Sequence, residues 1–259
     1  MVSIKTTFGL NNMGNTCYLN SAVQLLCLNP KFNNMENILI NPNKAIKKIK
    51  KTLATISSRF DGFSQEDSGE ALILLLEHYG KELDVLNDYE FIEKTRIRCK
   101  LMRCLNQEIT VRKSNVLLLD IQDNKTLDEC YRNIKNSVKL EGDEAWTCPK
   151  CKEALVSSKR FYFDYWSTFL IIGLKRFYYR GTRYVKNSNP IDIPFKWRHN
   201  YKLKGAIIHS GSLNGGHYIC VGYKDGDWYE FNDSSVNKIT SERVLNNYIS
   251  NSYFLLYQK

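Results

Sequence analysis

The chain has 259 residues, of which 43% are hydrophobic and 25% charged, and its formal net charge is +10. This composition is ordinary for a folded globular protein and excludes a disordered chain. Residues 1–8 lack an apolar core and a small-residue cleavage site, and no apolar run approaches the ~20 residues that a membrane span needs. We therefore predict a folded intracellular protein of the cytoplasm or nucleus, with no membrane partner.

Part of the positive charge lies in the run KAIKKIKK at residues 44–51. A basic surface can attract nucleic acid or an acidic protein surface. A charge run by itself more often forms the solvated face of a helix. We therefore expect no nucleic-acid partner.

Two helices are predicted in the first third of the chain. Residues 15–28 carry a possible cap at Asn15 or Thr16 and an apolar stripe of helical period. Residues 64–83 open with an S-x-x-D signal formed by Ser64 and Asp67. Strands are predicted over residues 97–111, 145–163 and 168–179, and the last third is rich in strand signals. Helices followed by strands predict the α+β class.

The nucleophile of a thiol-dependent enzyme is predicted at Cys17. It follows Gly14-Asn15-Thr16 and opens a helix, where unpaired backbone N–H groups stabilise a thiolate. The alternative for any single cysteine is a buried structural role. Three other cysteines lie in apolar surroundings and are predicted to be core residues: Cys27, Cys130 and Cys220.

The general base is predicted at His217, because Gly215 and Gly216 precede it and allow another backbone to come close. His209 could also serve, although it ends an apolar strand. The other two histidines, His78 and His199, lie in a helix and in a loop.

A hairpin turn at Asp225-Gly226 connects two predicted strands. With a two-residue turn, His217 faces Ser234, and Asn232 is its diagonal neighbour on the same side of the sheet. Asp233 then points to the opposite face. We predict Asn232 as the residue that orients His217, and Asp233 instead if the turn is longer or bulged.

An oxyanion formed during attack on a carbonyl needs prepositioned donors. The side-chain amide of Asn12, five residues before Cys17, is one candidate. Backbone N–H groups near Cys17 and the side chain of Asn11 are others. Asn12 can equally be a turn-forming residue.

These segments together resemble the ubiquitin-specific protease family of papain-like cysteine deubiquitinases. Residues 9–21 (GLNNMGNTCYLNS) resemble its Cys box. Residues 208–211, 215–218 and 228–234 resemble its His box, residues 65–70 (QEDSGE) its Gln/Asp box, and residues 174–177 (LKRF) a further landmark. Glu66 stands where the family usually has Gln.

The resemblance implies a single catalytic domain over residues 1–259. It implies a helical thumb at about residues 1–88, short β fingers at about 95–165 and an antiparallel β palm at about 166–259. It also implies a thiol protease that hydrolyses the isopeptide or peptide bond after the C-terminal Gly-Gly of ubiquitin. The implied partners are ubiquitin and ubiquitinated proteins, and we expect a monomer.

By position, the resemblance makes Cys17 the nucleophile, His217 the base, Asn232 the third member and Asn12 the oxyanion donor, with Asp233 assisting. Asp67 and Glu70 fall where the family holds the arginines of the ubiquitin tail, a task that suits carboxylates. Because the chain is basic, any acidic channel must be local. The residues expected to bind substrate are Gln65, Asp67, Glu70, Gly215, Gly216 and Tyr218. Residues 210–216 are expected to form a mobile loop over the channel.

Two cysteine pairs predict a structural zinc site in the fingers. Cys148 and Cys151 have the spacing of half a zinc knuckle, and Cys99 and Cys104 would supply the other half. The second pair departs from the family pattern because four residues separate its cysteines. The zinc would be structural, since its ligands are remote in sequence from Cys17.

Three other functions fit parts of the sequence. The first is a protease for a ubiquitin-like modifier with the same Gly-Gly end. The second is a catalytically inactive ubiquitin-binding scaffold, against which the presence of Cys17, His217 and Asn232 argues. The third is a zinc-ribbon nucleic-acid binder that uses residues 44–51.

Overall fold

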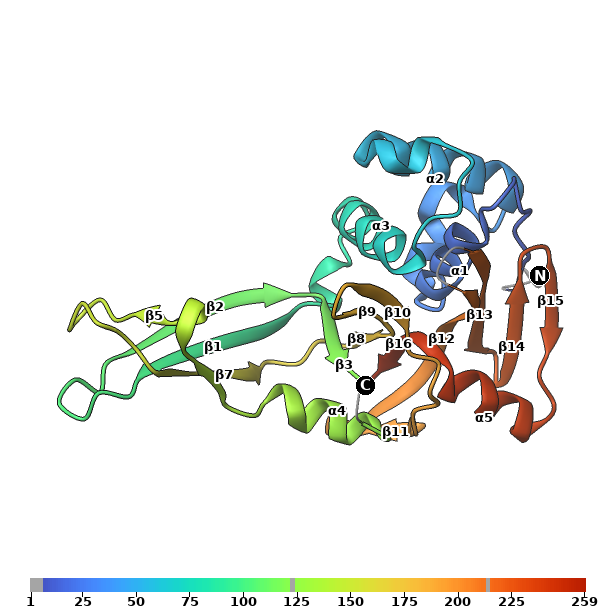
Figure 1. Cartoon of the computed structure of the whole chain (residues 1–259). Coiled ribbons are helices and arrows are strands. Elements are labelled where there is room, and N and C mark those ends of the chain that lie inside the picture. The colour runs from blue at the N-terminus through green and yellow to red at the C-terminus, as the bar shows by residue number, and fades with distance from the viewer. Residues whose placement is uncertain (1–6, 122–123, 213–214) are drawn as a thin grey trace.

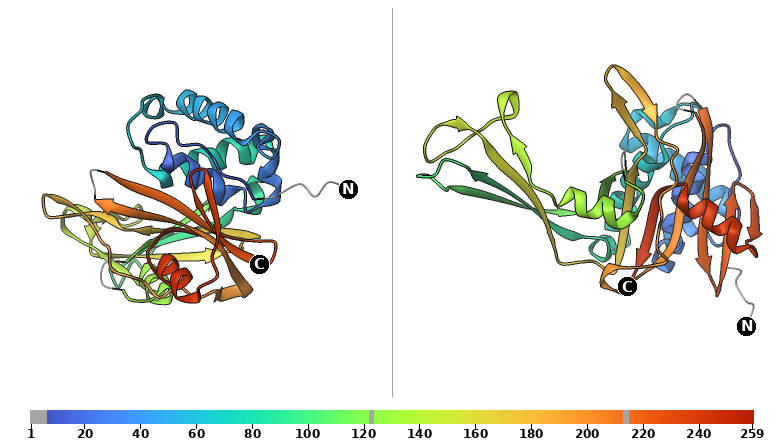
Figure 2. Two further views of the ribbon diagram at one scale, coloured as in Figure 1. Left: turned by 90° about the vertical axis from the view of Figure 1, so that its right-hand side faces the viewer. Right: turned by 60° about the horizontal axis from the view of Figure 1, so that its bottom comes forward.

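A computed structural model describes residues 7–121, 124–212 and 215–259. A helical lobe from the first third of the chain lies against a large sheet, and a long ribbon of strands projects away from both (Figure 1). The right-hand view of Figure 2 also shows this ribbon extending away from the rest of the molecule. The predicted α+β class is confirmed. Residues 1–6, on which much of the signal-peptide prediction rests, lie outside the described residues, as do residues 213–214 of the predicted loop.

The helical lobe is built around α1, all ten residues of which are buried. This helix packs between α3 and strand β13 (Gly215–Lys224). On α2 the buried positions are Ala45, Ile46, Ile49 and Leu53, so most of its lysines face solvent, as predicted for residues 44–51. The helices of this lobe are α1 (Cys17–Leu26), η1 (Pro30–Asn37), α2 (Pro42–Ile56), η2 (Ser58–Asp61), α3 (Ser68–Glu82) and η3 (Leu86–Asp88).

Helix α3 begins four residues later than predicted. Its N-cap is Asp67, whose side chain accepts the N–H of Glu70 at 2.9 Å. Ser64 lies in the preceding irregular segment. Both residues are good capping types, and the cap that forms is the one directly before the buried apolar face. As a result Gln65, Glu66 and Asp67 lie in an extended segment at the mouth of the lobe rather than on the helix.

The large sheet, which we name the palm sheet or palm, has eight strands. Their order is β15-β14-β13-β12-β16-β8-β3, and β11 pairs with β12. All described pairings are antiparallel except β3 with β8. Its strands are β3 (Val116–Asp120), β8 (Phe169–Lys175), β11 (Lys196–Trp197), β12 (Tyr201–Ser212), β13, β14 (Asp227–Asn232), β15 (Ser235–Lys238) and β16 (Ser252–Gln258).

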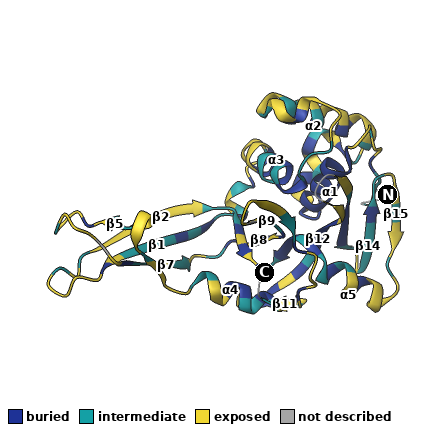
Figure 3. Ribbon diagram, in the orientation of Figure 1, coloured by how far each residue is buried: buried dark blue, intermediate teal, exposed yellow. Residues whose placement is uncertain are grey.

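The central part of the palm sheet is buried on both faces, as the run of buried residues 169–174 in β8 requires. Phe169 and Ile171 pack with the helical lobe, whereas Leu170 and Ile172 pack in a second core. That second core is covered by α4 (Leu127–Ile134) and α5 (Glu242–Ser250). Figure 3 shows the central strands and α1 as buried and β2 of the projecting ribbon as exposed.

The projecting ribbon is a four-stranded sheet with the order β2-β1-β7-β4. The predicted strand at residues 97–111 is two strands, and the loop between them contains Cys104. The predicted strand at residues 145–163 is likewise divided, and the loop between β5 and β6 contains Cys148 and Cys151. The strands are β1 (Phe91–Cys99), β2 (Gln107–Ser114), β4 (Val138–Leu140), β5 (Trp146–Thr147), β6 (Ala154–Leu155) and β7 (Ser157–Asp164), and a separate hairpin is formed by β9 (Phe177–Arg180) and β10 (Arg183–Lys186).

The predicted hairpin of β13 and β14 is confirmed with its register. Lys224 pairs with Asp227, and the ladder runs to the pair Cys220 and Phe231. Asp225 and Gly226 have φ values of 50° and 92°, the two positive values that a two-residue type I′ turn needs. The ladder has no bulge, so Asn232 stays on the face predicted for it.

None of the helices in the described part of the chain is long and apolar enough to cross a membrane. The division into thumb, fingers and palm at residues 88, 95 and 166 stays a prediction.

Candidate active site

Cys17 is the first residue of α1 and its side chain is buried. A tight turn delivers it there, with positive φ at Gly14 (93°) and Asn15 (53°). Sγ of Cys17 lies 3.8 Å from Nε2 of Gln65, and Gln65 also bonds the backbone of Gly216. The thiol therefore lies beside the segment that carries His217.

The pKa of the Cys17 thiol is raised, mainly because burial disfavours the thiolate, and the charge of Asp233 adds to this. Backbone hydrogen bonds from Tyr218, Tyr18 and Cys17 itself lower the pKa. The N–H groups at the helix start thus act as predicted, but burial outweighs them. The free thiol needs a base to become a nucleophile.

His217 lies on β13, and its Nε2 is 2.7 Å from Oδ1 of Asn232, the last residue of β14. An acceptor oxygen at this distance favours the tautomer with its proton on Nε2. The other ring nitrogen, Nδ1, then keeps its lone pair for a proton. Asn232, rather than Asp233, is the residue that contacts His217.

The other three histidines have different surroundings. Burial lowers the pKa of His209 to about 4, with contributions from Lys186 and His217, so its ring is neutral at pH 7. His78 lies 3.7 Å from Glu82 on the exposed side of α3. His199 stacks on Trp166.

Asp233 joins the two catalytic segments instead of orienting the imidazole. Its Oδ2 accepts Nδ2 of Asn12 at 2.9 Å, its Oδ1 accepts Nδ2 of Asn20 at 2.7 Å, and its carbonyl oxygen accepts the N–H of Leu10 at 2.8 Å. The sequence analysis missed Asn20. Its position three residues after Cys17, on the same face of α1, was the available signal.

Asn12 lies in the turn before α1. Its Oδ1 accepts the backbone N–H groups of Gly14 and Thr16, both at 3.1 Å. Its Nδ2 donates to Asp233, so one of the two amide hydrogens is already engaged. The amide of Gln65, at 3.8 Å from Sγ, is the side-chain donor for which the structure gives a contact with Cys17.

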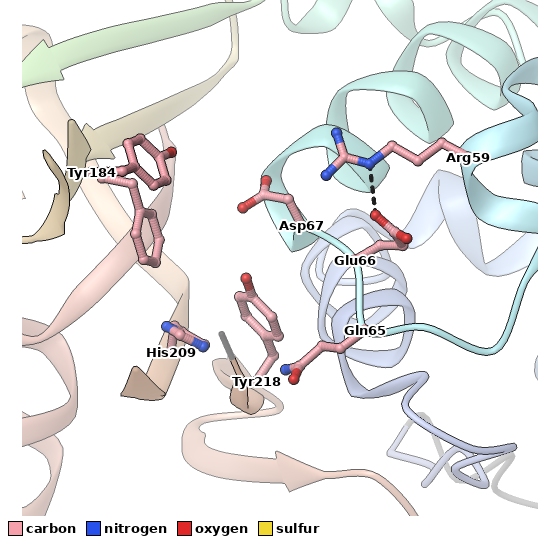
Figure 4. A pocket seen from close by; sticks show the side chains of 9 residues that line it. Arg59, Gln65, Glu66, Asp67, Tyr184, His209 and Tyr218 are labelled. Carbon is pink, nitrogen blue, oxygen red and sulfur yellow. Dashed lines mark hydrogen bonds and ion pairs between the residues drawn. The ribbon is translucent and has the colours of Figure 1, made fainter. Parts of the chain in front are cut away.

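A groove lies at the boundary between the helical lobe and the palm, and Gln65, which contacts Cys17, is one of the residues that line it. Its inner part is a cavity of about 230 Å³. Figure 4 shows Arg59, Gln65, Glu66 and Asp67 on one side of this cavity, and Tyr184, His209 and Tyr218 on the other. An adjoining apolar groove shares Asp67 and Tyr184 with the cavity, and Glu70 and Leu118 lie along it. The expected substrate-binding residues Gln65, Asp67, Glu70, Gly215 and Tyr218 all line these two spaces.

Gly216 is held where no side chain fits. A Cβ there would lie 2.3 Å from the carbonyl oxygen of Ser210 and 2.4 Å from Nε2 of His209. Gln65 also bonds both backbone groups of Gly216, donating to the oxygen at 2.6 Å and accepting the N–H at 3.0 Å. Gln65 thus joins the segment that carries His217 to the segment before α3, beside Cys17.

Asp67 is fixed by more than its role as helix cap. Its Oδ2 accepts the hydroxyl of Tyr253 at 2.9 Å, and burial raises the pKa values of Tyr253 and Tyr218, both of which lie near this carboxylate. The sequence analysis missed Tyr253 and Arg59, because neither belongs to a recognisable motif.

The four cysteines predicted as metal ligands come together at the far end of the fingers. The Sγ atoms of Cys99, Cys104, Cys148 and Cys151 all lie within 4.8 Å of one another. Four thiolates at about 2.3 Å from one ion are the usual ligands of structural zinc. The cluster therefore fits a zinc ion despite the longer loop between Cys99 and Cys104.

A profile described as "Ubiquitin carboxyl-terminal hydrolase" matches residues 35–257. Ubiquitin carboxyl-terminal hydrolase 36 of Drosophila pseudoobscura pseudoobscura is 29% identical over 312 residues, which cover 96% of this chain and 29% of that protein. Human ubiquitin carboxyl-terminal hydrolase 42 is 26% identical and is matched over 96% of this chain and 22% of its own length. The chain thus spans less than a third of these relatives.

Solved structures show the same fold. The SAGA deubiquitinating module Ubp8/Sgf11/Sus1/Sgf73 bound to monoubiquitin matches with a TM-score of 0.83 and 24% identity, over 100% of this chain and 70% of the matched chain. The same module bound to ubiquitin aldehyde matches with a TM-score of 0.81. The papain-like architecture that the sequence predicted is confirmed, and the profile match over most of the sequence shows that this chain belongs to the ubiquitin carboxyl-terminal hydrolase family.

Proposed function

We propose that the chain is a cysteine-type deubiquitinase that hydrolyses the isopeptide or peptide bond after the C-terminal Gly-Gly of ubiquitin. Family membership supports the reaction class. The observation that carries the assignment of residues is the 2.7 Å bond between His217 and Asn232, next to a thiol at the start of a buried helix.

In the proposed reaction His217 takes the proton of the Cys17 thiol, and the resulting thiolate attacks the carbonyl carbon of the last glycine. The tetrahedral intermediate collapses when His217 gives this proton to the departing lysine nitrogen. A thioester remains on Cys17. A water molecule then loses a proton to His217 and attacks the thioester, which releases the ubiquitin carboxylate and restores the thiol.

Asn232 acts in this scheme by holding His217 in the tautomer with a free Nδ1. The oxyanion is assigned to three donors near the thiol: the Asn12 amide, the Gln65 amide and the backbone N–H of Cys17. Preorganised donors of this kind usually provide a large part of the rate enhancement. Asp233 is assigned the role of holding the Asn12 segment against the His217 hairpin.

The substrate tail is proposed to lie in the groove, with its two glycines between Gln65 and the segment Gly215–Tyr218. The close approach of Gln65 to Gly216 supports a passage that admits only residues without side chains. Asp67 and Glu70 are assigned to the tail arginines. The fingers would be stabilised by a zinc ion on Cys99, Cys104, Cys148 and Cys151.

A ubiquitin probe with a thiol-reactive C-terminus tests this proposal. We expect a covalent adduct with the wild-type chain and none with Cys17→Ala. Parallel probes built on other modifiers test the alternative of a ubiquitin-like substrate, and an adduct with one of those alone would replace ubiquitin in the proposal. Ubiquitin binding without any adduct would favour the inactive scaffold. The expected monomeric state, intracellular location and lack of a nucleic-acid partner stay predictions.

A further inference from the structure

One wall of the groove carries three carboxylates, those of Glu66, Asp67 and Glu70, and an arginine of the chain itself lies on this acidic wall. Arg59, on the short helix η2, donates from Nε to Oε2 of Glu66 and from Nη1 to Oε2 of Glu70, each at 2.6 Å. Figure 4 shows its guanidinium group directed at Glu66 beside Asp67, on the wall opposite Tyr184. The Arg59 side chain is 56% exposed, so it lies at the surface of the wall, where solvent reaches it.

The three carboxylates of this wall differ in the hydrogen bonds and ion pairs that they already make. Asp67 is committed to the N–H of Glu70 and the hydroxyl of Tyr253. Glu66 and Glu70 are each joined to Arg59 through one oxygen. The groups best able to accept an incoming guanidinium are therefore the ones that Arg59 already holds.

Resting on the proposed function, we propose that Arg59 is a specificity-determining residue that competes with the arginines of the substrate tail for Glu66 and Glu70. A guanidinium group presents a rigid fork of donors that matches a carboxylate. Two such groups on one carboxylate pair repel each other, so the tail must displace Arg59 or bind with one bond fewer. The chain thereby binds a basic tail less tightly than its acidic wall alone would allow.

The competition between Arg59 and the tail arginines depends on the carboxylate of Glu66. The resemblance leads to Gln at this position, and a neutral amide would hold a guanidinium group more weakly than a carboxylate does. Arg59 and Glu66 thus form a charged pair next to the position that carries Glu70. Arg59 by itself reduces the net negative charge of the three carboxylates by one.

The competing explanation is that Arg59 only fixes η2 to the start of α3. Removal of Arg59 would then loosen the wall, and binding of every tail would weaken equally. The competition mechanism predicts the opposite sign and a dependence on the tail arginines. The two explanations are separated by one set of affinities.

The experiment measures the Kd of ubiquitin by titration calorimetry in a Cys17→Ala background, with and without Arg59→Ala. Ubiquitin with both tail arginines replaced by alanine is the second ligand. Lys31→Ala is the matched control, because Lys31 is a cation of the same lobe with a 58% exposed side chain, paired with Asp88 at 2.8 Å. Thermal unfolding of each variant verifies that it is folded.

We expect Arg59→Ala to tighten binding of ordinary ubiquitin by about three- to tenfold at low salt, the range that loss of a charge-assisted pair produces. Binding of the alanine tail should change by less than about twofold, as should both affinities in Lys31→Ala. Arg59→Lys should fall between, because it keeps the charge and loses the fork. With Cys17 present, the same change should lower KM.

Weaker or unchanged binding of ordinary ubiquitin by Arg59→Ala would overturn the inference. A gain of equal size for both tails would do so as well, since no competition with arginine would be involved. Binding with the expected affinities but no hydrolysis by the wild-type chain would overturn the proposed hydrolase and support the role of Arg59. Absence of ubiquitin binding in all variants would overturn both.

Discussion

The imidazole Nε2 of His217 and the amide oxygen of Asn232 lie 2.7 Å apart on neighbouring strands of one hairpin. The ladder between these strands is regular up to the pair Cys220 and Phe231. The position of the amide therefore depends on an unbulged two-residue turn at Asp225-Gly226. A single inserted residue in that turn would bring Asp233 to this face instead.

Loss of this contact should slow hydrolysis. Asn232→Ala is expected to lower kcat by about 10- to 100-fold, because orientation of the imidazole is one part of a general acid–base contribution of 10²–10⁴. The measurement is cleavage of a fluorogenic ubiquitin substrate. Asn237→Ala is the control, since Asn237 lies on β15 and its side-chain amide donates to the neighbouring Ser235. Equal rates for Asn232→Ala and wild type would remove Asn232 from the mechanism.

Asp233 should matter more for stability than for the chemistry of proton transfer. Asp233→Ala removes the carboxylate that accepts Nδ2 of Asn12, and it removes the shortest of the contacts that Nδ2 of Asn20 makes. It is expected to lower the free energy of unfolding by about 1–3 kcal/mol. Thermal or urea unfolding measures this loss. Asp227→Ala on the same strand pair removes an exposed ion pair with Lys238 and should cost under about 1 kcal/mol. Equal losses for the two variants would contradict the role of Asp233 in joining the two catalytic segments.

The reactivity of Cys17 should depend on His217 and on pH. Burial raises the thiol pKa, so without a base the thiolate fraction at pH 7.5 is below that of an ordinary cysteine. In His217→Ala, alkylation of Cys17 by iodoacetamide should be slower than in wild type, and its midpoint should lie above the usual cysteine value. Mass spectrometry of the Cys17 peptide gives the rates. A midpoint below the usual value in this variant would show that the helix terminus suffices to form the thiolate.

The two glycines before His217 should differ in their tolerance of a side chain. Gly216→Ala places Cβ 2.3 Å from the carbonyl oxygen of Ser210, whereas the nearest atom to a Cβ on Gly215 is 4.0 Å away. Gly216→Ala should therefore lower Tm by several degrees and Gly215→Ala by much less, about 1 °C or below, since a clash costs about 1–3 kcal/mol and open space nothing. A larger loss for Gly215→Ala would contradict this description of the groove.

The cysteine cluster should bind about one zinc ion per chain. Cys148→Ser is expected to abolish the bound zinc and to lower Tm, because the fingers have little apolar core of their own. Elemental analysis and thermal unfolding with and without a chelator measure these effects. Cys130→Ser is the control, since Cys130 is a buried residue of α4 and lies outside the cluster. Full zinc content in Cys148→Ser would exclude the cluster as the site.

Local signals in the sequence were sufficient for much of the site. The turn residues Asp225 and Gly226 determine the register that brings Asn232 to His217, and alternation along a strand transmits this register without reference to the rest of the fold. Helix α1 could likewise be predicted from its apolar stripe. The predicted start of α3 was wrong because Ser64 and Asp67 are both good caps, and the local sequence does not decide between them.

Contacts between distant segments were not accessible in this way. Asn20 and Tyr253 acquire their partners only when the helical lobe meets the palm. Arg59 acquires Glu66 and Glu70 only when η2 packs beside the start of α3. The net effect on the Cys17 pKa was also missed, because burial depends on how β13 covers the helix start. Asn12 was identified as a functional candidate, but its engagement with Asp233, 221 positions away, could not be predicted.

Strand β16 lies in the middle of the palm, paired with β12 on one side and β8 on the other. During synthesis, β8 and β12 leave the ribosome long before residues 252–258 do, and they cannot join until this strand is inserted between them. The two halves of the palm sheet therefore stay separate on a nascent chain. The sheet that carries His217 and Asn232 is complete only once this late strand has paired on both of its edges.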